Sequence, residues 1–268
     1  MIPMPPGAIA FAPRFPSEVS VEMLLETGST NAVALARAAA GAPHLTLIWT
    51  KRQTAGRGRE KRAWISSEGN LFWSIILRPQ ADWGDICELA FVTALAVHSA
   101  IRPHVSASKT VSLKWPNDTL IGGAKVSGAL LESSGARRNA AGRLTADAVV
   151  VGIGINIVHF PIDAMMYPAT SLRAEGSLVD RDHLLGDLTD AFLGALDLWI
   201  ERGFLTIRDS YLERAHGLRS LVTVRTSTAP GDTVTGVFES IDTTGLIELR
   251  CQDGILRKLS AGDVFFKT

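Results

Sequence analysis

Apolar runs and the polar residues between them divide the chain into short strands and longer helices. Strands are indicated where β-branched and aromatic residues form short runs flanked by turn residues, namely at 45–50, 71–77, 111–115, 124–133 and 147–156. Helices are indicated where apolar residues recur at helical spacing, namely from Asp85 to about Ile101, at 181–202 and at 204–215. We expect the last two helices to cover a sheet.

Turn and capping residues set the ends of other segments. An alanine-rich helix is expected to begin at one of three capping residues, Ser29, Thr30 or Asn31, and to end at Gly41. The glycines of 121–123 predict a hairpin turn. Residues 134–146 are polar and are expected to form a loop.

The pattern changes after about Leu218. From there, short alternating strands are separated by glycine and aspartate turns, which is typical of a small β barrel. We therefore expect one domain at 1–217, whose first 25 residues form a leading arm, and a small barrel at 218–268.

Composition narrows the classes of function. Lys+Arg and Asp+Glu number 27 each, so there is no overall positive field to hold DNA or an anionic membrane. We also expect no segment able to span a bilayer, which needs roughly 20 apolar residues. The two cysteines, Cys87 and Cys251, lie far apart in the sequence, which favours a reducing compartment and a cytoplasmic location.

Positive charge is nevertheless concentrated at 54–64 (TAGRGREKRAW), between two predicted strands. This loop carries four cations: Arg57, Arg59, Lys61 and Arg62. Gly56 and Gly58 let the backbone approach a ligand closely, and arginine forks match phosphate or carboxylate groups. The loop therefore predicts an anion site, against the alternative of a solvated connection whose charges bind nothing.

Two lysines lie on predicted strands. Lys125 has the small residues Ser127 and Ala129 on its own face by the period of two, which leaves room for a ligand. Lys114 alternates with apolar neighbours, so it points away from the face on which they pack. For a single lysine the alternative is a head group in water, and it stays open here.

Several common catalytic motifs are absent. The sequence has no P-loop, no Cys and His set with zinc spacing, and no serine nucleophile elbow. Ile157 stands where a dinucleotide fingerprint starting at Gly152 needs its third glycine. If ATP is used, these motifs do not hold it.

A family resemblance rests on six segments: TGSTN (27–31), QTAGRGREKRAW (53–64), GNLFWSIIL (69–77), LKWPND (113–118), GAKVSGALLE (123–132) and VGIGIN (151–156). With these segments in this order, the chain resembles the biotin protein ligases. The resemblance implies an α+β fold with a mixed central β-sheet and flanking helices, like that of class II aminoacyl-tRNA synthetases. A small C-terminal SH3-like β barrel is implied to follow.

The resemblance also implies a two-step reaction. The biotin carboxylate attacks the α-phosphate of ATP to form biotinyl-5′-adenylate and pyrophosphate, and biotin then passes to a lysine of a biotin carboxyl carrier protein. ATP and Mg²⁺ are implied with biotin as the substrate, although no direct motif for the metal is present. Fixed cations and Mg²⁺ would oppose the repulsion between the carboxylate and the triphosphate.

The implied roles fall on residues that match the family motifs. Biotin binding is implied for Ser29, Thr30, Asn31, Gln53, Arg57, Gly58, Arg59 and Lys125. ATP binding is implied for Trp64, Lys114, Asn117, Asp118 and Asn156. Catalysis is implied for Lys125, Arg57 and Arg59, with Lys125 as the first choice because it would contact carboxylate and phosphate oxygens in both steps.

Two departures from the family pattern matter. Only 28 residues precede Ser29, too few for the winged helix with which bifunctional members bind DNA, so no DNA partner is expected. Lys61 stands where many relatives have glycine, which leaves its effect on the loop open. The nearest alternative function is a lipoate or octanoate ligase or transferase of the same fold; another is a non-enzymatic, biotin-responsive regulator. Dimerisation through the edge of the main sheet also stays open.

Overall fold

The computed structural model describes residues 15–79, 81–138, 141–162, 167–226 and 232–266. Within these ranges the elements are β1 (Ser20–Thr27), α1 (Thr30–Ala39), β2 (Thr46–Gln53), η1 (Arg59–Lys61), β3 (Leu71–Leu77), α2 (Trp83–Ile101), η2 (Arg102–His104), β4 (Val111–Lys114), β5 (Asp118–Ile121), β6 (Ala124–Arg138), β7 (Leu144–Ile155), α3 (Arg181–Arg202), α4 (Phe204–Leu212), β8 (Leu221–Arg225), β9 (Thr233–Ile241), β10 (Ile247–Arg250), β11 (Leu256–Leu259) and β12 (Asp263–Phe266).

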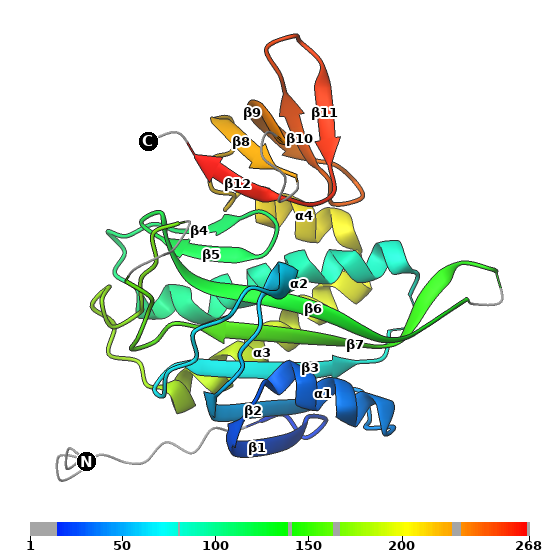
Figure 1. Cartoon of the computed structure of the whole chain (residues 1–268), viewed down its shortest axis with the longest axis vertical. Helices are drawn as coiled ribbons and strands as arrows, with labels where there is room; N and C mark the ends of the chain where they lie inside the picture. The colour runs from blue at the N-terminus through cyan, green and yellow to red at the C-terminus, as the bar shows by residue number, and fades with distance from the viewer. Residues whose placement is uncertain (1–14, 80, 139–140, 163–166, 227–231, 267–268) are drawn as a thin grey trace.

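The larger sheet has seven strands in the order β1-β2-β3-β7-β6-β5-β4. β1 runs parallel to β2, whereas the other neighbouring strands are antiparallel, so the sheet is mixed. Helix α1 packs on one face, and α2 and α3 pack on the other (Figure 1). The predicted α+β fold is confirmed.

Strand β3 shows why the centre of this sheet needs a continuous apolar run. All seven of its residues are buried, because helices cover both faces. On one face, Trp73 packs against Phe192 of α3 with ring centroids 5.1 Å apart, and its Nε1 donates to Thr189 Oγ1. On the other face, Ile76 packs with Ala34 of α1. The small alanine lets α1 lie close to the sheet.

A second sheet of five antiparallel strands, in the order β11-β10-β9-β8-β12, follows α4. This is the small β unit that the alternating pattern after Leu218 predicts. It packs beside α4 and the β4–β5 hairpin (Figure 1). Whether 218–268 is a separate domain stays a prediction.

The leading arm is shorter than expected. Residues 20–25 belong to β1, which pairs with β2 in register from Ser20 opposite Thr46 to Thr27 opposite Gln53. This edge strand has no fully buried residue, and Val21, Met23 and Leu25 are exposed. Because β1 is held by main-chain pairing and not by a buried face, its side-chain pattern gave only a weak signal.

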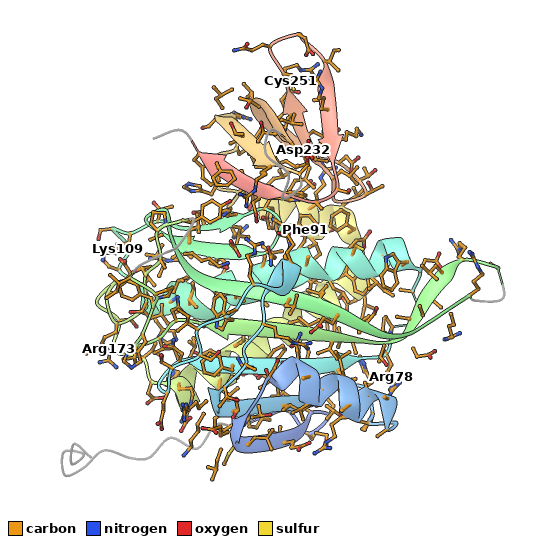
Figure 2. All side chains as sticks on the ribbon, in the orientation of Figure 1. Arg78, Phe91, Lys109, Arg173, Asp232 and Cys251 are labelled. Atoms are coloured by element: carbon orange, nitrogen blue, oxygen red, sulfur yellow. The ribbon has the colours of Figure 1, made fainter. Side chains whose placement is uncertain are left out.

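The loop expected at 134–146 is mostly a strand pair. β6 continues to Arg138 and β7 starts at Leu144, with Arg137 opposite Thr145. The pairing satisfies the backbone, while Arg137 and Arg138 of this projecting hairpin are exposed to solvent (Figures 1 and 2). Polar composition therefore did not mean irregular backbone here.

One segment does have the length and composition of a membrane crossing, contrary to our expectation. It runs from Trp83 to His104, and 61% of its most apolar window is buried inside the protein. α2 packs against the sheet and alongside α3, a position typical of the core helix of a globular protein.

Candidate active site

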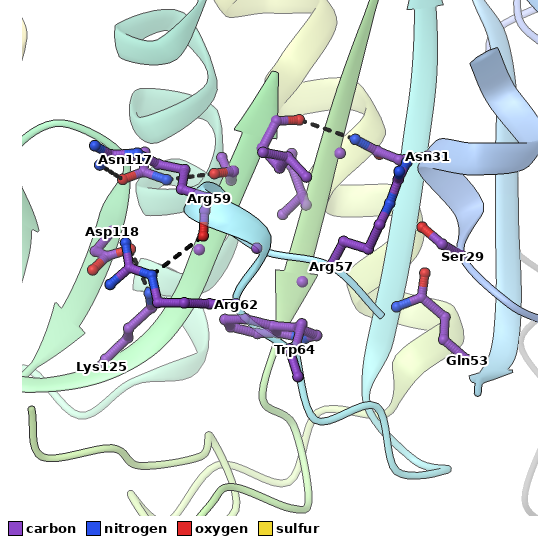
Figure 3. Close-up of a pocket in the computed structure, with 18 of the residues that line it drawn as sticks. Ser29, Asn31, Gln53, Arg57, Arg59, Arg62, Trp64, Asn117, Asp118 and Lys125 are labelled. Carbon is purple, nitrogen blue, oxygen red and sulfur yellow. Dashed lines mark hydrogen bonds and ion pairs between the residues drawn. The ribbon is translucent and has the colours of Figure 1, made fainter. Parts of the chain in front are cut away.

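A cavity of about 300 Å³ lies on the face of the larger sheet that carries α1 (Figure 3). All but two of the predicted site residues line it: Ser29, Thr30, Asn31, Gln53, Arg57, Gly58, Arg59, Trp64, Asn117, Asp118 and Lys125. These residues come from the start of α1, the end of β2, the cationic loop and β5–β6. The segments therefore meet around one space.

The end of the cavity nearest α1 carries hydrogen-bonded amide and hydroxyl groups beside the Arg57–Glu132 ion pair, which has no net charge, and we call it the neutral end. Gln53 Oε1 accepts hydrogen bonds from the Thr30 backbone N–H at 2.8 Å and from Thr30 Oγ1 at 3.1 Å. Ser74 Oγ lies 2.7 Å from both Thr30 Oγ1 and Asn31 Oδ1. Ser29 occupies the N-cap position of α1, but its hydroxyl makes no capping hydrogen bond. This network holds amide and hydroxyl groups in fixed positions toward the cavity.

The cationic loop folds back on itself as a small hairpin. The Trp64 N–H donates to Gly56 O at 2.9 Å, and the Gly58 N–H donates to Arg62 O at 2.7 Å. A Cβ on Gly56 would lie 2.3 Å from Ser66 Oγ and 2.5 Å from Trp64 O. Glycine is therefore required at position 56 by the packing of the loop itself.

The arginines of the loop reach both the main sheet and the small barrel, and Arg59 also donates from Nη2 to Gly262 O at 3.4 Å. Arg57 pairs with Glu132 of β6 at 3.0 Å, and Arg59 Nη1 donates to Asn117 Oδ1 at 3.1 Å. Arg62 donates to both carboxylate oxygens of Asp263 at 3.2 Å. The loop thus spans the cavity from the main sheet to the small barrel.

Asp118 gathers the two lysines at the other end of the cavity. Lys125 Nζ lies 2.6 Å from Asp118 Oδ1, and Lys114 Nζ lies 3.5 Å from Asp118 Oδ2. Lys114 is 4% exposed, and its Nζ lies 3.1 Å from the centre of the Tyr167 ring. Burial lowers the pKa of Lys114 to about 8, although the nearby carboxylate of Asp118 opposes that shift. Neither lysine has its head group in bulk water.

Gly128 lies beside the Lys125 side chain, where the sequence pattern predicted Ser127. The pairing of β5 with β6 shifts register so that Thr119 lies opposite Ser127 but Leu120 lies opposite Lys125. This bulge breaks the period of two, and Gly128 takes the place expected for Ser127. A Cβ on Gly128 would lie 3.1 Å from Lys125 Nζ. The absence of a side chain at 128 makes room for the lysine.

Trp64 lies across the glycines of β6 and β7. A Cβ on Gly154 would lie 2.5 Å from Trp64 Nε1, so the indole needs glycine at this position. Trp64 Nε1 is buried and has no hydrogen-bond partner. The site therefore contains an aromatic ring with a free donor beside Lys125, whose Nζ lies 5.4 Å from the ring centre.

Lys114 and Asn156 do not line the cavity. Lys114 lies behind the cavity wall, where it contacts the lining residues Asp118 and Tyr167. Asn156 is buried and donates from Nδ2 to Thr170 O at 3.0 Å. Its position fits a role in holding the segment after β7 better than direct contact with a nucleotide.

Sequence reasoning missed the lining residues Tyr167 and Asp263, and it counted Arg62 only among the cations of the loop. Burial raises the pKa of Asp263, but hydrogen bonds from Arg225 and Arg62 outweigh burial and lower this pKa below its usual range. Tyr167 Oη is buried without a hydrogen-bond partner. Asp263 comes from β12, so the small barrel completes the wall of the cavity.

Comparison with known proteins identifies the family. The model of the biotin/lipoate A/B protein ligase family matches residues 27–156, and that of the biotin protein ligase C-terminal domain matches 222–267. The chain is 37% identical to a biotin–[acetyl-CoA-carboxylase] ligase of Paracoccus denitrificans, over 91% of this chain and 99% of that one. The chain belongs to the biotin protein ligase family.

Two further relatives extend this result. The chain is 27% identical to the biotin protein ligase from Aquifex aeolicus, solved in complex with biotin and ATP, with a TM-score of 0.74 over 92% of this chain and 97% of that chain. It is 34% identical to a bifunctional ligase/repressor, BirA, of Bacillus spizizenii over 88% of this chain and 70% of that protein. The match to a biotin ligase C-terminal domain and these relatives favour the biotin ligases over the lipoate alternative.

Proposed function

We propose that this chain is an ATP-dependent biotin ligase. It joins biotin to ATP to form biotinyl-5′-AMP and pyrophosphate, and then transfers biotin to a lysine of a biotin carboxyl carrier domain. Support comes from relatives named biotin–[acetyl-CoA-carboxylase] ligase at 37% and 31% identity and from the similar Aquifex aeolicus enzyme with biotin and ATP.

One observation carries the proposal. A single cavity has a neutral end built on Thr30 and Gln53 and a cationic end built on Arg59 and Lys125 (Figure 3). Biotin has the same division, with an uncharged ureido ring at one end and a carboxylate at the other. The carboxylate would then lie where cations can also hold the α-phosphate.

The neutral end suits the ureido ring, which has two N–H donors and one carbonyl acceptor. Ser29, Thr30 and Gln53 offer hydroxyl and amide groups, and Asn31 is held in place through Ser74 and Glu132. We assign biotin recognition to these residues. Arg57, Gly58 and Arg59 form the part of the loop that closes over biotin.

Lys125 is the residue that we assign to catalysis. Its ammonium group can neutralise charge as a carboxylate oxygen of biotin bonds to the α-phosphorus and the bond to pyrophosphate breaks. In the second step, a neutral acceptor lysine attacks the acyl carbon, AMP departs with the electrons of the broken C–O bond, and the amine loses a proton. Asp118 holds Lys125 in position at 2.6 Å. Lys114, which contacts Asp118 and Tyr167, is a positioning residue in this scheme.

The nucleotide is assigned to the region of Trp64, whose ring offers a stacking face. Asn117 and Asp118 border this region. We leave Asn156 out of the direct contacts because its side chain donates to Thr170 O.

The cavity also suits Mg²⁺, which proteins usually hold by one or two carboxylates together with substrate phosphates. Asp118 has a carboxylate and Asn117 an amide oxygen on the cavity wall. These oxygens now contact Lys125, Lys114 and Arg59, so an ion would share them with these cations or replace them. When bound there with the nucleotide, the ion would supply positive charge to the phosphates.

We also propose a cellular location and an oligomeric state for this protein. A cytoplasmic location fits the two free cysteines, Cys87 and Cys251. A homodimer through β1 fits the exposed apolar side chains of that edge strand. Size-exclusion chromatography with light scattering would test it, and a monomer at all concentrations would contradict it.

The test of the proposed function is release of pyrophosphate from ATP and Mg²⁺ with biotin or with lipoate. Release is expected with biotin and should fall by about a hundredfold or more in Lys125→Ala, because a preorganised charge contact is lost. Lys51→Ala, which changes a lysine of β2 outside the cavity, serves as the matched control. Release with lipoate alone, or no release with either acid, would refute the proposal.

A further inference from the structure

A second cluster of chemically reactive side chains lies on the opposite face of the sheet from the cavity. It consists of His104, at the end of η2, and of His183 and Asp187 on α3. His183 and Asp187 are four residues apart, so they project from the same side of the helix. Since α2 and α3 pack on the face that α1 does not cover, this cluster is separate from the proposed active site.

The three side chains converge on a small space. His104 Nε2 lies 2.6 Å from Asp187 Oδ2, and His183 Nε2 lies 3.6 Å from the same oxygen. One ligand atom from each residue lies within 4.8 Å of the other two. In tetrahedral zinc sites, bonds of about 2.0–2.1 Å place ligand atoms about 3.4 Å apart. The spacings here bracket that value.

His104 and His183 both contact the carboxylate of Asp187, and their ring centres lie 5.4 Å apart with the planes at 86°. Convergence of two imidazoles and one carboxylate is the donor set that suits zinc and its neighbours in the first transition series. Calcium and magnesium prefer oxygen ligands.

From this geometry we infer that His104, His183 and Asp187 form a binding site for a divalent transition-metal ion of the zinc class. Their side chains are 19%, 48% and 38% exposed, so an ion can enter from solvent and keep water as a further ligand. The ion would join the end of α2 to the first turns of α3. It would stabilise the folded protein because the unfolded chain lacks the assembled site.

The experiment is a calorimetric titration of Zn²⁺ into the full chain without a histidine tag. We expect saturable binding of one ion per chain, weakened about tenfold or more in His183→Gln and in Asp187→Asn. His159→Gln, which changes an exposed histidine outside the cluster, should bind Zn²⁺ like the wild type. Absence of saturable binding, or equal affinity in His183→Gln and the wild type, would overturn the inference.

Thermal unfolding gives a second readout. The midpoint should rise with added Zn²⁺ in the wild type and return to its starting value with a chelator, whereas His183→Gln should show neither change. Without added zinc, the midpoint of His183→Gln should match the wild type, which shows that the variant is folded. Biotin-dependent pyrophosphate release without added zinc should also be unchanged, so the two proposals can fail independently.

Discussion

Lys114 should make this protein more stable as the pH rises above 8. A surface lysine whose pKa is raised by an ion pair would have the opposite effect. Its ammonium group is buried beside Asp118 and Tyr167, and burial lowers its pKa from 10.5 to about 8. At pH values between 8 and 10.5, the Lys114 side chain is therefore protonated to a greater extent in the unfolded chain than in the folded chain. Raising the pH from 8 to 10.5 therefore relieves a cost on the folded state.

The size of this effect follows from linkage. A difference of about 2.5 in pKa corresponds to about 3 kcal/mol of cost when the lysine is protonated in both states, as at pH 7. By pH 9.5, when the folded chain has lost this proton, about 2 kcal/mol of that cost is gone. Lys114→Met keeps the length of the side chain and removes the titration.

Urea unfolding followed by circular dichroism at pH 7 and pH 9.5 gives the measurement. The free energy of unfolding of the wild type minus that of Lys114→Met should rise by about 2 kcal/mol between the two pH values. Taking the difference cancels other groups that titrate in this range, and Lys51→Met serves as the matched control. A difference that stays constant within about 0.5 kcal/mol would refute the account of a desolvated ammonium group.

Two further predictions concern the cavity wall. In Gly154→Ala, the new Cβ would lie 2.5 Å from Trp64 Nε1 and must displace the indole. Because stacking of a base on an aromatic ring contributes about 1–3 kcal/mol, steady-state kinetics should show that the KM for ATP rises about tenfold or more. An unchanged KM would show that Trp64 does not hold the base. In Asp263→Asn, the side chain that pairs with Arg62 and Arg225 loses its negative charge. Charged hydrogen bonds contribute about 1.5–3 kcal/mol each, so the barrel should hold the loop less firmly. The rate of biotin-dependent pyrophosphate release should then fall at least about tenfold. Full activity would show that the barrel does not position the loop.

Local signals predicted the buried elements well. β3 is a continuous apolar run because both of its faces are covered, and α3 shows helical periodicity because one side of it faces the core. The turn at 121–123 is set by glycines with positive φ at 122 and 123. Most of the candidate site followed from segments whose residues are adjacent in the sequence. These segments lie at strand and helix ends that meet at one face of the sheet.

Long-range features could not be found in this way. Arg62 and Asp263 are 201 residues apart, and no local pattern joins them. The same holds for His104, which meets His183 only because α2 and α3 pack side by side. The bulge that sets Gly128 under Lys125 likewise depends on pairing between β5 and β6. Packing decides all three features.

The contacts of the cationic loop suggest how it can both stay ordered and exchange partners. The Arg57–Glu132 pair is substantially exposed, at 41% and 27%, so it contributes little stability and can give way to an anionic ligand. Arg59 donates to a neutral amide oxygen, which a phosphate or carboxylate can replace with a stronger charged acceptor. Arg62 instead donates to both oxygens of Asp263, whose side chain is 9% exposed. Because Arg62 alone of the three makes two charged hydrogen bonds to a largely buried carboxylate, we expect the loop to remain anchored to the barrel at Arg62 while Arg57 and Arg59 turn toward the ligand.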